Sequence, residues 1–108
     1  MTPAEAIRSL DGQLQEHGQD VVLRKGNTTV GEKTVRAFVR GYKPAELIGG
    51  LKQGDKKVSI SATGLAGFGE PADIAAVFFD SKPRSVQGEP EIIRLAGQLV
   101  RVNLTVRG

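Results

Sequence analysis

Apolar residues near the amino terminus recur three and four positions apart, at Ile7, Leu10 and Leu14. This spacing places them on one face of an α-helix. Thr2 and Glu5 can cap each other's backbone N–H groups at the start of such a helix, and Pro3 suits its first position. Since Gly18 can end the helix, the sequence predicts a helix over residues 3–17.

Beyond Gly18, apolar and polar residues alternate with the period of two that is typical of β-strands. The clearest case is the last ten residues, where the apolar positions are Val100, Val102, Leu104 and Val106. The alternation predicts strands at residues 19–25, 33–41, 56–61, 73–80, 83–87 and 98–107. Because these strands are short and are divided by Gly and Pro, we expect one domain over residues 1–108, mainly β, with a small antiparallel barrel or sandwich from about residue 19 onward.

The connection GYKPAELIGGLKQGD, residues 41–55, is long and carries a glycine pair. Long connections in small domains are often functional, although an ordinary surface connection is the alternative here and for the glycine-bearing connection at 62–71. We expect the first connection to face a channel or a neighbouring subunit. Its candidate residues are Tyr42, Lys43, Pro44, Leu47, Ile48, Gly49, Gly50, Leu51, Lys52 and Asp55.

The last strand has a second, polar face. A strand in this place must pair inside its own fold or beside another copy, because unpaired strand edges invite association. The sequence leaves both arrangements open. The candidate interface residues on this face are Arg101, Asn103, Thr105 and Arg107.

The amino-acid composition excludes several kinds of catalytic and metal site. The 108 residues contain no cysteine and one histidine, His17, so thiolate metal sites, Cys–His pairs and His-based triads cannot be built from one chain. Glu89 and Glu91 flank Pro90 in a stretch expected to be a solvated loop. We therefore expect no enzyme, no metal and no cofactor. The lack of cysteine and of a signal-peptide pattern at the amino terminus predicts an intracellular protein, and the lack of an apolar run long enough to span a bilayer predicts no membrane partner.

The net charge of +3 is spread along the chain rather than gathered in one stripe. Four arginines nevertheless fall on predicted strand faces, at Arg36, Arg40, Arg101 and Arg107. They keep open an alternative function, a small barrel that binds single-stranded nucleic acid.

Four segments together carry a family resemblance: HGQDVVLRKG (17–26), RAFVRGYKPAELIGGLKQGDKKVSIS (36–61), FFDSKPRSV (78–86) and LAGQLVRVNLTVRG (95–108). In this order they resemble the head–tail joining proteins of long-tailed bacteriophages, in the head-closure or stopper group. The likeness covers most of the chain. It is weakest at residues 62–80, where the approach to the strand is apolar rather than polar.

The resemblance implies a short helix before a small β-barrel and a structural role in the virion, with the host cytoplasm as the site of assembly. Subunits of this family form a ring at the head–tail neck that retains packaged DNA and presents a platform to the tail. The implied partners are further copies of the chain, portal or adaptor proteins on the head side, and tail-tube or tail-terminator proteins on the tail side, with non-specific contact to packaged DNA. Another neck or tail-terminator subunit of the same virion is a further alternative.

Overall fold

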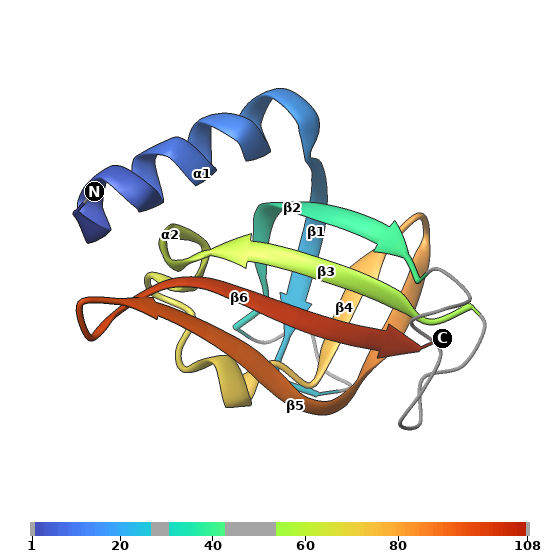
Figure 1. The fold of residues 1–108 in the computed structure, drawn as a ribbon. Helices are drawn as coiled ribbons and strands as arrows, with labels where there is room; N and C mark the ends of the chain where they lie inside the picture. Colours follow the sequence, from blue (N-terminus) through green and yellow to red (C-terminus); the bar gives the residue numbers. More distant parts are fainter. Residues whose placement is uncertain (1, 27–30, 43–53, 108) are drawn as a thin grey trace.

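The computed structural model describes residues 2–26, 31–42 and 54–107, and it shows a closed antiparallel barrel of six strands with one long helix outside it (Figure 1). The mainly β fold with an amino-terminal helix is thus confirmed. The elements in chain order are α1 (Pro3–His17), β1 (Gln19–Arg24), β2 (Lys33–Gly41), β3 (Lys56–Ser61), α2 (Ala62–Leu65), η2 (Pro71–Asp73), β4 (Ala76–Phe79), β5 (Lys82–Leu95) and β6 (Gln98–Arg107).

The strands close in the order β1-β2-β3-β6-β5-β4, and β4 pairs with β1. β6 therefore lies between β3 and β5, with Val58 of β3 opposite Leu104 and Val86 of β5 opposite Val106. The last strand is an internal strand of its own barrel. Of the two arrangements that the sequence left open, the structure shows this one.

The barrel interior is filled by the apolar residues of the period-two pattern. Val100, Val102, Leu104 and Val106 are all buried, as the alternation predicted. One end of the interior is covered by the connection between β3 and β4, from which Leu65, Phe68 and Ile74 join the core. This connection is not a plain loop, because α2 and η2 each give it a short helical turn.

Helix α1 has the bounds that the sequence predicts. The Thr2 hydroxyl accepts a hydrogen bond of 3.2 Å from the backbone N–H of Glu5, and the Glu5 carboxylate accepts one of 3.3 Å from the N–H of Thr2. Of the apolar face, Leu10 and Leu14 are buried. These two residues do not belong to the main core cluster, so α1 packs on the barrel as a separate layer (Figure 1).

The structure corrects the strand boundaries in the second half of the chain. β5 continues to Leu95 instead of ending at residue 87, and β4 is confined to Ala76–Phe79 instead of spanning 73–80. Glu89 and Glu91, expected in a solvated loop, thus lie in a strand. A register shift between Gln87 and Glu91 absorbs Gly88 and Pro90 in a bulge, a feature that tolerates both residue types in β-sheets.

Candidate functional site

The outer face of β3, β6 and β5 carries a hydrogen-bond network centred on Asn103. Its side-chain carbonyl accepts hydrogen bonds from the Ser59 hydroxyl at 2.7 Å and from Nε of Arg101 at 3.0 Å. Its amide donates to Glu91 at 2.6 Å, and Nη2 of Arg101 donates to Ser59 at 3.1 Å. Asn103 was predicted on the polar outer face, where it lies, but the network leaves only 6% of it exposed. It is therefore a buried residue that serves contacts within the fold, and its predicted role at an interface between subunits stays a prediction.

Both flanks of the first long connection are bonded to β6. On one flank, the hydroxyl groups of Tyr42 and Thr105 lie 2.7 Å apart in a hydrogen bond. On the other flank, the Asp55 carboxylate accepts hydrogen bonds of 2.9 Å from both Nε and Nη2 of Arg107. The structure thus brings Tyr42 and Asp55 of the first predicted group into contact with Thr105 and Arg107 of the second.

The remaining candidates of that connection lie outside the described residues. They are Lys43, Pro44, Leu47, Ile48, Gly49, Gly50, Leu51 and Lys52. Their predicted role in facing a channel or a neighbouring subunit stays a prediction.

The ion pair between Asp55 and Arg107 also shifts the pKa of the arginine. The Asp55 side chain is 1% exposed, and its carboxylate accepts two of its hydrogen bonds from the guanidinium. In return, the hydrogen bond to Asp55, supported by its negative charge, raises the pKa of Arg107 above the ordinary value for arginine. Because the folded-state pKa of Arg107 is raised, the stabilisation that its charge provides is complete below the pKa of arginine in the unfolded chain and is lost as the pH rises through the folded-state pKa.

A pocket of about 280 Å³ opens on this same face of the barrel. Its lining extends from Tyr42 to the bulge of β5 and includes the ammonium group of Lys57 and the carboxylates of Glu89 and Glu91. The lining residues are Tyr42, Lys57, Glu89, Glu91, Asn103, Leu104 and Thr105. This lining suits a polar segment of another chain better than an apolar one.

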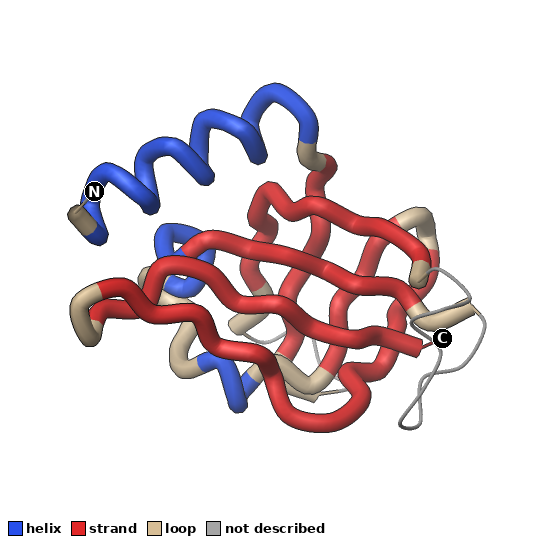
Figure 2. The backbone as a smooth tube through the Cα atoms, viewed as in Figure 1, coloured by secondary structure: helices blue, strands red, loops and turns tan. Residues whose placement is uncertain are grey.

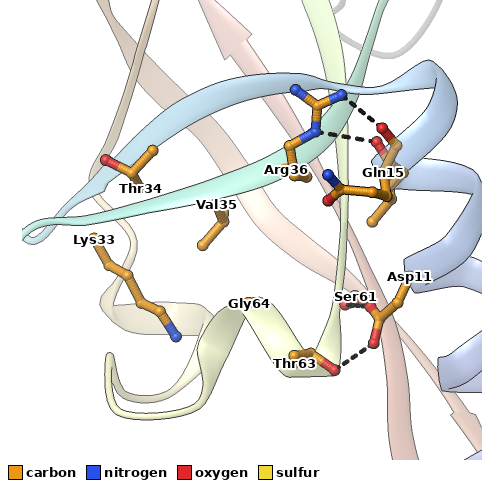
Figure 3. Close-up of a pocket in the computed structure, with 10 residues that line it drawn as sticks. Asp11, Gln15, Lys33, Thr34, Val35, Arg36, Ser61, Thr63 and Gly64 are labelled. Carbon is orange, nitrogen blue, oxygen red and sulfur yellow. Dashed lines mark hydrogen bonds between the residues drawn. The ribbon is translucent and has the colours of Figure 1, made fainter.

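A larger pocket, of about 330 Å³, lies between α1, β2 and α2 (Figure 3). Asp11 of α1 accepts hydrogen bonds from the hydroxyl groups of Ser61 and Thr63 on one side of it. On the other side, the Arg36 guanidinium of β2 donates to the backbone carbonyls of Leu14, Gln15 and Gly18, at 3.2, 3.1 and 2.7 Å. Helix α1 is therefore held on both sides of this pocket, by the hydrogen bonds of Asp11 and by those of Arg36.

The four arginines on strand faces all have partners within the chain. Arg36 caps the end of α1, and Arg101 belongs to the Asn103 network. Arg107 binds Asp55, and Arg40 donates to the carbonyl of Gly41 with its guanidinium 5.5 Å from the Tyr42 ring centre. Each of these four guanidinium groups thus makes a contact within the fold.

Sequence reasoning did not identify Ser59 and Glu91 as parts of the site. Small hydroxyl residues in β3 were visible in the sequence, but their partner Asn103 lies 44 positions away, and only the strand register brings the two together. For Glu91 the assignment to a loop concealed its place opposite Asn103. His17 ends α1, as predicted.

Within residues 2–26, 31–42 and 54–107 there is no group of three or more His, Cys, Asp or Glu residues placed to hold a metal ion. The helices of that same part of the chain are too short or too polar to cross a membrane. Comparisons with protein-family models, with curated proteins and with solved structures found no match to this chain.

Proposed function

We propose that the protein is a structural subunit of a ring at the head–tail neck of a long-tailed bacteriophage, of the head-closure or stopper type. The proposal rests on the family resemblance of residues 17–26, 36–61, 78–86 and 95–108. The structural observation that supports it best is the attachment of both flanks of the connection at 43–53 to the single strand β6.

This attachment suits a closure subunit for a mechanical reason. A subunit that places a segment at a channel needs a frame that does not deform when the segment bears a load. The closed barrel has no free sheet edge along β6, and the contacts of Tyr42 and Asp55 fix both flanks to that strand. The entry and exit of the connection are thus both bonded to one internal strand of the barrel.

The described surface gives less support to the nucleic-acid-binding alternative. Non-specific binders of single strands combine a cationic groove with exposed aromatic rings. Here the guanidinium groups of Arg36, Arg101 and Arg107 serve contacts within the fold. The resemblance is also compatible with an adaptor or tail-terminator role in the same neck. Experiment can distinguish these roles from the stopper role.

Immunogold electron microscopy of phage particles, with antibodies raised against the purified protein, tests the proposal. We expect label at the junction of head and tail. In a phage that lacks the gene, we expect heads that lose their DNA and unattached tails of normal length. DNA-filled heads with tails of irregular length would instead indicate a tail terminator, and absence of label from particles would refute a virion role.

A further inference from the structure

The hairpin formed by the end of β5 and the start of β6, residues 91–98, is exposed at every position and extends beyond the barrel wall (Figure 2). We call it the hairpin arm. In the part of the chain that the structure describes, the exposed large hydrophobic residues all lie on this arm: Ile92 at 38%, Ile93 at 40% and Leu95 at 37%. Large apolar side chains gathered at one exposed tip are typical of an interaction surface.

One face of the hairpin arm presents an ordered set of side chains. Residues two apart in a strand point to the same side, so Glu91, Ile93 and Leu95 share a face. Ile93 is opposite Arg101 and Arg94 is opposite Leu99, so the register shift leaves Val100 of β6 without a partner in β5. β5 therefore keeps its alternation, and a carboxylate is followed by two apolar side chains on this face.

The hairpin arm has little support from its own barrel. β4 pairs with β5 only as far as Ser85, so the described strands leave β6 as the sole neighbour of β5 from Glu91 to Leu95. Two-stranded ribbons are marginally stable in water unless one face is covered. Burial of Ile93 and Leu95 against another molecule would supply that cover.

A fitting surface exists elsewhere on the same chain, in the 330 Å³ pocket beside α1. Leu14, Val35 and Gly64 give it an apolar part. Its lining also carries two positive charges against the single lining carboxylate of Asp11. That carboxylate already accepts two hydroxyl donors. The Lys33 ammonium group donates to the carbonyl of Ala66, and Arg36 is bonded to α1 and to Asp20. A cavity of about 150 Å³ can hold a benzene ring, so this pocket has room for two aliphatic side chains.

We propose that the hairpin arm of one copy of this chain docks in the α1 pocket of a second copy. Ile93 and Leu95 enter the apolar part, and Glu91 approaches Lys33. The contact is heterologous, since arm and pocket are different surfaces, and such contacts generate rings when the rotation between subunits closes. Its biological role rests on the proposed function, because it names the contact that would join neighbouring subunits of the ring.

The contact is expected to be weak between two free molecules. Two apolar side chains and one charge pair bury far less surface than a stable interface of about 1,600 Å². Ring closure strengthens it, because each subunit of a closed ring is held by two contacts at once. The isolated protein is therefore largely monomeric in dilute solution.

Cysteine cross-linking tests the contact directly, since the natural chain has no cysteine. Leu95→Cys places a thiol on the arm, Thr34→Cys places one at the pocket, and Ala72→Cys is an exposed control position away from the pocket lining. Oxidation of concentrated 1:1 mixtures should give at least fivefold more disulfide-linked dimer for the Leu95/Thr34 mixture than for the Leu95/Ala72 mixture. Equal yields in the two mixtures would overturn the proposal, as would Leu95→Cys alone forming dimers as fast as the Leu95/Thr34 mixture.

A charge exchange then tests the predicted pairing. Lys33→Glu in the Thr34→Cys protein should lower the cross-linking yield severalfold, and Glu91→Lys in the Leu95→Cys protein should restore it. Circular dichroism of each variant checks that the barrel is folded. If folded Lys33→Glu protein cross-links at the original rate, the proposed docking is wrong.

These measurements use purified protein, so they are independent of any role in the virion. Cross-linking without gold label on particles would retain the contact and remove the proposed function. Label at the neck without cross-linking would retain the function and remove the contact.

Discussion

The guanidinium of Arg107 donates two hydrogen bonds of 2.9 Å to the carboxylate of Asp55, which lies 52 positions earlier in the sequence. Paired bonds of this kind are among the stronger and more directional interactions in proteins. Asp55 is buried and directly precedes β3, whereas Arg107 ends β6. The pair therefore fixes the beginning of one strand to the end of its neighbour.

Loss of the ion pair between Asp55 and Arg107 should destabilise the barrel. Arg107→Ala leaves the Asp55 carboxylate buried without its main partner, and we expect the thermal midpoint to fall by roughly 5 °C or more. The double variant Asp55→Ala/Arg107→Ala should recover part of the loss, because the buried carboxylate is removed together with the guanidinium. Arg94→Ala on the exposed hairpin arm is the matched control and should leave the midpoint unchanged in calorimetry. A midpoint of Arg107→Ala equal to that of the control would contradict the importance of the pair.

Arg36 should control the attachment of α1. Arg36→Met keeps an apolar stem but removes the donors to Leu14, Gln15 and Gly18, and we expect a loss of about 1–2 kcal/mol in helix docking. Amide exchange should show faster exchange in α1 and little change in β3 and β6. Arg40→Met, on the same strand but outside this contact, is the control. Unchanged protection of α1 in Arg36→Met would show that the helix is held by its apolar face alone.

Two glycines in the amino-terminal region should respond in opposite ways to alanine. A Cβ at Gly18 would lie 2.5 Å from the carbonyl oxygen of Leu14 and 2.8 Å from that of Ala37, so the backbone must shift. We expect Gly18→Ala to lower the free energy of unfolding by about 1–3 kcal/mol. Gly12 in α1 has open space around it, and Gly12→Ala should raise stability by about 0.5–1 kcal/mol. Urea titration measures both, and a neutral Gly18→Ala would refute the close approach.

The connection at 43–53 is expected to act in the assembled particle. Replacement of Gly49 and Gly50 by alanine, or shortening between Lys43 and Gln53, should leave the barrel folded, because loop changes rarely disrupt a core. Phages that carry such changes should produce heads that leak DNA or do not accept tails. Titres of infectious particles and electron microscopy measure the outcome. Normal titres from a folded variant would remove this connection from the proposed mechanism.

Binding to single-stranded DNA should be weak. The positive charges are dispersed and several serve contacts within the fold, so few phosphates can be neutralised at once and affinity should vanish near physiological salt. Fluorescence anisotropy with a labelled oligonucleotide across a salt series measures this. Submicromolar affinity at physiological salt would favour the nucleic-acid-binding alternative over the neck subunit.

The parts of the fold that depend on local signals were predictable from the sequence. The bounds of α1 follow from Thr2, Glu5 and Gly18, which act within a few positions of one another. Strand β6 follows from its strict alternation. The extension of β5 was not predictable in this way, because Gly88, Pro90 and two glutamates have the composition of a loop, and only the pairing with β6 turns them into a bulged strand.

The candidate site was predicted in part. Tyr42, Asp55, Thr105 and Arg107 were each selected, but their mutual contacts depend on the closure of the barrel. The burial of Asn103 was not predictable, since it requires Ser59 and Glu91 from two neighbouring strands. Polar residues on one face of a strand identify a surface, whereas their burial depends on what the adjacent strands carry.

The position of β6 between β3 and β5 also affects the synthesis of the chain on the ribosome. While a ribosome still holds residues 98–107, β3 and β5 each lack the neighbour that completes the barrel. Nascent chains on one crowded messenger would then present open edges that can pair wrongly, a hazard for β-proteins of non-local topology. The barrel, and any surface that needs it, forms only after β6 has left the ribosome.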